Sequence, residues 1–201
     1  MAVKSWSVGV YSAPLFSRRG FLVKPRFLTV AFVVADAIGV MCFSAFAQTQ
    51  VAAEARLKER HIVLPAPPKP VGNYVEWVRV GNLLYLAGHG GGPQWRGKGK
   101  VGKDVTLQQG YHCARDVGLN QLATMREALG SLDKVKRIVK VFGMVNSAPG
   151  FSDQPKVIDG FSDLMIEVFG NAGKHVRSAV GMAELPFGIP VEIETIVEVK
   201  D

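Results

Sequence analysis

The order of strand-like and helix-like periodicities is the feature of this sequence that most constrains its fold. Strand segments alternate apolar and polar residues or are rich in β-branched residues, and helical segments repeat apolar residues every three or four positions. The predicted strands are 74–80, 83–87, 135–145, 178–183 and 191–199, the two long helices are predicted at 106–129 and 155–169, and a short helix is predicted at 48–60. Two helices and one sheet predict an α+β domain, a two-layer sandwich with both helices on one face of the sheet.

The turn and cap residues around these segments support the assignment. Gly81-Asn82 is a two-residue turn signal between the first two strands, which predicts a hairpin. Thr106, with Gln109 three residues later, forms a capping box at the start of the first long helix, and Gly130 ends that helix. The last strand alternates, so one face of the sheet packs against the helices. The other face needs a cover, which oligomerisation would supply.

The first 47 residues have the features of an export signal. Paired arginines, Arg18-Arg19, precede an apolar stretch at 27–46, which runs into the small-x-small site Ala45-Phe46-Ala47. The arginine stretch resembles the twin-arginine signal, so we expect a signal peptide over 1–47, a single domain over 48–201, and a periplasmic or secreted protein. One alternative is a start codon assigned too early, which would leave the protein cytoplasmic. The other is an uncleaved signal that anchors the chain in a membrane.

Composition and spacing argue against several kinds of site. Five basic residues and one acidic residue fall within 1–47, so the formal charge of +7 is largely a property of that segment and indicates no nucleic-acid partner. The four histidines lie at no recognised ligand spacing, so no metal site is expected. The glycine-rich stretch 97–104 has Asp104 where a phosphate loop needs Ser or Thr. Cys113 lies within a predicted helix and is expected to be a small buried thiol.

Three positions hold residue types that are suited to ligand binding or catalysis, and each also has an ordinary structural explanation. Arg177 precedes an apolar strand, where it is either a surface residue or a fork that binds a carboxylate. Glu192 is either on the solvated face of a strand or a proton-transfer group in a cleft. The run Gly88-His89-Gly90-Gly91-Gly92 either lets the backbone approach a ligand or is only a flexible loop. From spacing alone, the structural alternative is favoured at all three.

Several motifs taken together resemble the Rid family, the reactive intermediate deaminases that are also called the YjgF family. The most specific motif is the segment 177–186 (RSAVGMAELP), followed by Val191-Glu192-Ile193-Glu194. Supporting segments at 71–75, 80–89 and 139–145 occur in the family's order. The resemblance covers about residues 54–201. It implies a chorismate-mutase-like fold with a mixed sheet, a homotrimer, and clefts between subunits.

The resemblance also implies roles for residues of this chain. Arg177 would bind the substrate carboxylate, while Glu192 would orient water and transfer a proton. The expected site residues are Arg177 and Glu192 as catalytic, and Tyr74, Gly88, His89 and Ala179 as substrate-binding. Two departures concern that site, since His89 stands where the family usually has Gln and Ala179 where it often has Cys. A third is a set of extra residues between Val145 and the last helix.

The implied reaction is hydrolysis of a small 2-imino or enamine acid to the 2-keto acid and ammonia, with no cofactor. The expected partners are a small carboxylate substrate and two further copies of the chain. The alternative is a non-catalytic trimer that binds a carboxylate metabolite or a partner protein.

Overall fold

The structure is a computed structural model that describes residues 52–201, so the predicted signal over 1–47 lies outside the described residues. The helices of this part are α1 (Ala53–Glu59), α2 (Leu107–Leu129) and α3 (Gln154–Phe169). The strands are β1 (Trp77–Val80), β2 (Leu83–Gly90), β3 (Val135–Asn146), β4 (Val176–Met182) and β5 (Val191–Val199). None of the helices in the described range combines the length and the apolar character that a membrane span requires.

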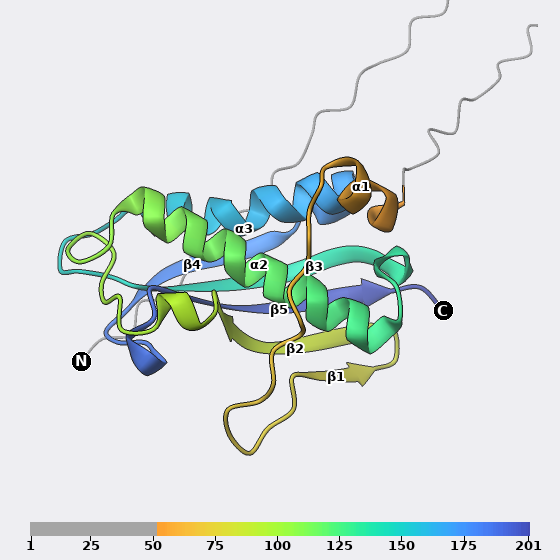
Figure 1. Cartoon of the computed structure of the whole chain (residues 1–201), viewed down its shortest axis with the longest axis horizontal. Helices are drawn as coiled ribbons and strands as arrows, with labels where there is room; N and C mark the ends of the chain where they lie inside the picture. Colours follow the sequence, from red (N-terminus) through yellow and green to blue (C-terminus); the bar gives the residue numbers. More distant parts are fainter. Residues whose placement is uncertain (1–51) are drawn as a thin grey trace, which may run out of the picture. The chain divides into compact units, whose positions relative to one another are not determined.

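The five strands form one mixed sheet in the order β1-β2-β5-β3-β4. Only the β3–β4 pair is parallel, and the other neighbours are antiparallel. The two long helices, α2 and α3, lie side by side on the same face of the sheet (Figure 1). The predicted α+β sandwich, with a mixed sheet and helices on one face, is therefore confirmed.

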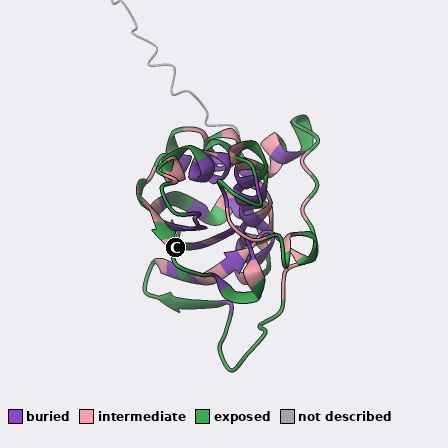
Figure 2. Cartoon of the chain, turned by 90° about the vertical axis from the view of Figure 1, so that its left-hand side faces the viewer, coloured by how far each residue is buried: buried purple, intermediate pink, exposed green. Residues whose placement is uncertain are grey.

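Local sequence explains where α2 begins and ends. Thr106 and Gln109 form the reciprocal capping box, and Gly130 has the left-handed conformation (φ 78°) that ends the helix. The apolar stripes of α2 and α3 face the sheet, and buried residues gather between the two layers (Figure 2). Cys113 is fully buried there, and burial raises the pKa of its thiol to about 12, as fits a packing residue.

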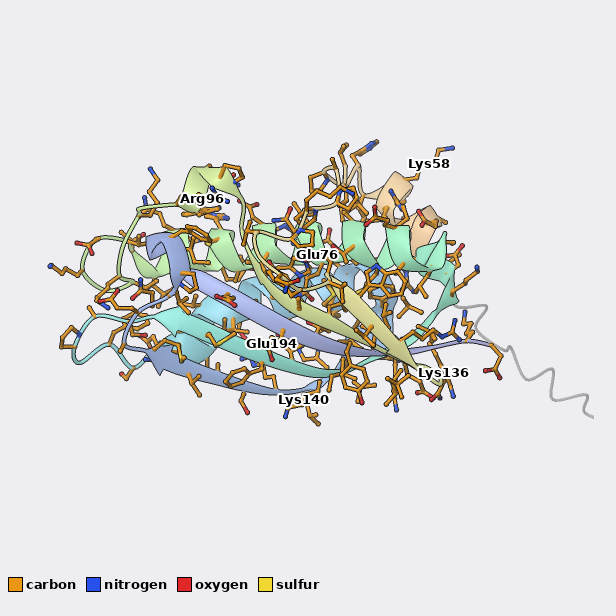
Figure 3. All side chains as sticks on the ribbon, turned by 90° about the horizontal axis from the view of Figure 1, so that it is seen from below. Lys58, Glu76, Arg96, Lys136, Lys140 and Glu194 are labelled. Carbon is orange, nitrogen blue, oxygen red and sulfur yellow. The ribbon has the colours of Figure 1, made fainter. Side chains whose placement is uncertain are left out.

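The opposite face of the sheet is left open, without a helical layer. Cross-strand partners share a face, so the pairing of Met144 with Glu192 places both on this side. Figure 3 looks onto the open face from below and labels Lys140 and Glu194 on it. Large apolar side chains near the two edges of the sheet are exposed, among them Val78, Val80, Tyr85 and Val176. This is the face for which the sequence predicts a cover.

Three strand boundaries differ from the prediction. β1 begins at Trp77 and not at Tyr74, β4 begins at Val176 and not at Ser178, and β2 continues past Ala87 to Gly90. The extension of β2 runs through a bulge between Leu86 and His89, beyond which β5 still offers partners. How far each strand extends depends on the hydrogen bonds that a neighbouring strand offers, and the periodicity of the sequence carries no information about that neighbour.

Candidate functional site

The carboxylate of Glu192 lies directly against the backbone of Gly88. A Cβ atom at Gly88 would be 2.2 Å from Glu192 Oε1, so only glycine leaves room for the carboxylate in this position. Gly88 belongs to the bulged part of β2, and Glu192 is on the adjacent strand β5. The structure therefore brings together two of the residues that the sequence identifies as candidates.

An apolar cluster borders Glu192 on the other side. Met144, the cross-strand neighbour of Glu192 on β3, is buried together with Leu185 and Ile189 from the loop that follows β4. Burial raises the pKa of the Glu192 carboxyl, and the negative charge of Glu194 adds to this shift. A carboxyl with a raised pKa exchanges protons more readily near neutral pH, which suits a proton-transfer group.

The side chain of His89 is directed into the interior, whereas the preceding residue, Gly88, lies against Glu192. The imidazole is 4% exposed, and its Nε2 atom lies 2.8 Å from Oε2 of Glu76, which is also buried. Burial lowers the pKa of His89 to about 4 and raises that of Glu76, so the protein interior favours the uncharged form of each group. Neither ring nitrogen of His89 makes a hydrogen bond of good geometry, and the role of His89 in substrate binding stays a prediction.

Arg177 is anchored to α3 by three contacts. Its Nη2 atom lies 2.7 Å from Asp159 Oδ1 and donates to the carbonyl of Pro155 at 3.1 Å. Its Nη1 atom donates to Ser162 Oγ at 2.8 Å. Ser162 Oγ is in turn 3.1 Å from Nε2 of His175, so the guanidinium is held in a connected polar network.

The same network determines the tautomer and the charge of His175. Its Nδ1 atom lies 2.7 Å from the carbonyl of Gly173, which requires a proton on that nitrogen. Burial lowers the pKa of His175, and the positive charge of Arg177 contributes in the same direction. The Ser162 hydroxyl then donates a hydrogen bond to Nε2 of the neutral ring, and Ser162 Oγ accepts a hydrogen bond from Arg177.

Arg177 and Glu192 lie on opposite faces of the sheet within one chain. Arg177 pairs with Val141, whose side chain is buried against the helices, whereas Glu192 pairs with Met144 on the open face. Strand β3 separates their strands and the two residues are three positions apart in register, which corresponds to about 10 Å across and about 10 Å along the sheet. A small substrate cannot contact both side chains of the same copy.

The two remaining candidates are Ala179, on the helical face, and Tyr74, in a loop outside the sheet. Ala179 is on β4, two residues after Arg177, and shares its face. Tyr74 is 44% exposed and lies in the loop before β1, where its hydroxyl accepts a hydrogen bond from the Val71 amide at 3.3 Å. The structure thus brings Gly88 and Glu192 together and turns the adjacent His89 side chain into the interior. It holds Arg177 and Ala179 on the helical face and leaves Tyr74 in a separate loop.

Several polar residues around these sites were not identified from the sequence. They are Glu76, Asp159, Ser162 and His175. Asp159 and Ser162 are three residues apart in a helical segment, so their common face was predictable. Their association with Arg177 was not, because it depends on which strand packs below α3.

The glycine-rich stretch 97–104 is a turn and not a phosphate cradle. Gly99 and Gly102 have left-handed backbones, and Nζ of Lys100 is engaged by Asn146 Oδ1 at 2.9 Å and Glu184 Oε1 at 3.1 Å. Within residues 52–201 no group of three or more His, Cys, Asp or Glu side chains is arranged to hold a metal ion.

Comparison with known proteins relates most of the described part of the chain to one family. Residues 54–190 match the family described as "YjgF/chorismate mutase-like, putative endoribonuclease". The chain is 41% identical to Protein TCP17 of Trypanosoma cruzi over 150 residues, which are 73% of this chain and 94% of that protein. It is 33% identical over 146 residues to the 2-iminobutanoate/2-iminopropanoate deaminase of Dermatophagoides farinae, covering 71% of this chain and 98% of that one.

A solved structure from Shewanella oneidensis MR-1, which carries the same endoribonuclease description, has the same fold. It superposes with a TM-score of 0.70 at 30% sequence identity, over 74% of this chain and 99% of that one.

Proposed function

The chain belongs to the YjgF/chorismate mutase-like family, and from this premise we propose that it hydrolyses small 2-imino acids to 2-keto acids and ammonia. The relative that is named a 2-iminobutanoate/2-iminopropanoate deaminase supports Rid-type deamination in general terms. The observation that carries the proposal is the Glu192 carboxylate, which lies over Gly88 with a raised pKa. This group is suited to move a proton at a carbon–nitrogen double bond.

In the proposed reaction, a water oxygen forms a bond to the imine carbon, and the carbon–nitrogen double bond becomes a single bond. Glu192 takes a proton from the water and delivers it to the nitrogen, which gives a tetrahedral carbinolamine. The carbon–nitrogen bond then breaks and the hydroxyl proton is lost, so that a keto group forms. The nitrogen departs as ammonia after it accepts that proton. Arg177 binds the substrate carboxylate throughout and fixes the imine carbon in place.

Two copies of the chain are needed to complete this site. Since Arg177 and Glu192 of one copy face opposite sides of the sheet, the substrate contacts Arg177 of one subunit and Glu192 of the next. The open face, with its exposed Val78 and Tyr85, supplies the surface on which a neighbouring copy packs. A closed ring of three copies would repeat this heterologous contact three times and form three clefts.

The test of the function is release of keto acid from freshly generated 2-aminoacrylate, by wild type and by two variants of Arg177. We expect Arg177→Ala to lose activity because the carboxylate has no partner. We expect Arg177→Lys to fail as well, because a point charge does not reproduce the planar fork. Circular dichroism and sedimentation serve as controls for folding and assembly. Full activity in both variants, or no wild-type rate above buffer, would contradict the proposal.

A second candidate function is a non-catalytic trimer that binds a carboxylate metabolite or a partner protein. The observations that favour it are the burial of His89 away from the open face and the methyl side chain of Ala179, which offers no reactive group. Calorimetric binding of 2-ketobutyrate without any turnover of the imine would select this alternative.

A further inference from the structure

The guanidinium of Arg177 already holds a carboxylate of its own chain. Asp159 Oδ1 is 2.7 Å from Nη2, and the Pro155 carbonyl accepts from the same nitrogen. An Nη2 atom has two hydrogens, so these two contacts engage both of them. The third contact, from Nη1 to Ser162 Oγ, anchors the other end of the group.

This arrangement affects how a second carboxylate can bind. A carboxylate forms a two-bond fork with a guanidinium either end-on, through Nη1 and Nη2, or side-on, through Nε and Nη2. Both forks use Nη2, which Asp159 and Pro155 occupy. A substrate carboxylate therefore gains the fork only when one of these two partners leaves.

Asp159 is the partner that can leave. It is a side chain on the surface of α3, 46% exposed, whereas the Pro155 carbonyl belongs to the backbone of the first turn of that helix. An ion pair that is this accessible to water is weak, so the exchange of one carboxylate for another costs little.

We propose that Asp159 sets the affinity of the site for carboxylates, as an internal carboxylate that competes with the substrate for Arg177. This inference rests on the proposed function, since it takes Arg177 as the group that binds the substrate carboxylate. The competition lowers the affinity of Arg177 for every carboxylate by the same factor. Only ligands that gain further contacts in the cleft displace Asp159. The residue thus acts as a threshold against small anions that carry a carboxylate and nothing else.

The experiment measures calorimetric binding of 2-ketobutyrate and KM for 2-aminoacrylate in the full-length protein. We expect Asp159→Asn to lower both the Kd and KM by about two- to fivefold, the range of a half-exposed ion pair, with kcat unchanged. Asp159→Ala should act at least as strongly because it also removes the neutral acceptor. Asp163→Asn is the matched control, since it makes the same charge change one turn further along α3, where Asp163 accepts from the Tyr111 hydroxyl.

The outcomes separate this inference from the function on which it rests. Unchanged or weaker binding in Asp159→Asn, together with lost binding in Arg177→Ala, would overturn the competition and leave the function in place. Equal tightening in Asp163→Asn would also overturn it, because the effect would then be one of general charge. If Arg177→Ala binds 2-ketobutyrate as wild type does, the proposed function itself fails.

Discussion

A single methyl group added at Gly88 should lower the activity strongly and the stability only slightly. In Gly88→Ala the new Cβ would lie 2.2 Å from Glu192 Oε1, so the carboxylate must move away from its present position. The carboxylate is the end of a flexible side chain, and the backbone of Gly88 does not have a positive φ. We therefore expect a loss of deaminase activity of at least about tenfold, with a change in stability of no more than roughly 1 kcal/mol.

Gly81→Ala is the control for this variant, since it adds a methyl group to the turn of the same hairpin. The turn position has a positive φ but open space around it, so the variant loses some stability through backbone strain and keeps its activity. Wild-type rates in Gly88→Ala, measured by the keto-acid assay, would show that the position of Glu192 is unimportant.

His89 should make the protein sensitive to acid. Its folded-state pKa is about 4, below the ordinary value of 6.5, so between these values the unfolded chain binds the proton and the folded chain does not. Wild type should therefore lose stability relative to His89→Gln as the pH falls from about 6.5 to about 4, by at most roughly 3 kcal/mol. Urea titrations at several pH values measure the difference. Glu76 is present in both proteins, and parallel stability curves would contradict the prediction.

The contact between α2 and α3 depends on two glycines with different surroundings. A Cβ at Gly160 of α3 would lie 2.0 Å from the Tyr111 carbonyl oxygen of α2, whereas a Cβ at Gly118 would meet the end of the Leu164 side chain at 2.8 Å. A backbone atom cannot yield without separation of the helices, but a leucine methyl group can rotate. The spacing of α2 and α3 is therefore set by Gly160.

We expect Gly160→Ala to lower the free energy of unfolding by about 2–3 kcal/mol. Gly118→Ala should change it by less than about 1 kcal/mol, because the better helix propensity of alanine offsets a small repacking cost. Urea unfolding of the two variants side by side provides the measurement. Equal destabilisation by the two substitutions would contradict the prediction that Gly160 sets the spacing of α2 and α3.

At the scale of the whole molecule, a site shared between copies predicts complementation. Arg177→Ala and Glu192→Gln should each be inactive alone. In mixed trimers, about a quarter of the interfaces join a native Arg177 to a native Glu192, so co-refolded mixtures should recover about that fraction of wild-type activity. Mixtures of separately folded trimers that do not exchange subunits are the control. A co-refolded mixture without activity would place the complete site within one chain.

Much of the secondary structure follows from the sequence alone. The capping box at Thr106 and the stop at Gly130 define α2 because they act over three or four residues, within reach of local patterns. The alternation along β5 also holds, with Val191, Ile193 and Val197 buried. The ends of β1, β2 and β4 were misplaced because hydrogen bonds with a neighbouring strand decide them.

The sequence by itself determined which residues are candidates, because the motifs that resemble the Rid family contain Arg177, Glu192 and Gly88. Only the tertiary structure decided where those groups point. Strand pairing assigns Arg177 to the helical face and Glu192 to the open face, and the packing of α3 brings Asp159 to the guanidinium. The physical reason is that periodicity describes the relation of a residue to its own element. The side of the sheet and the partner across it depend on register between segments that are distant in the chain.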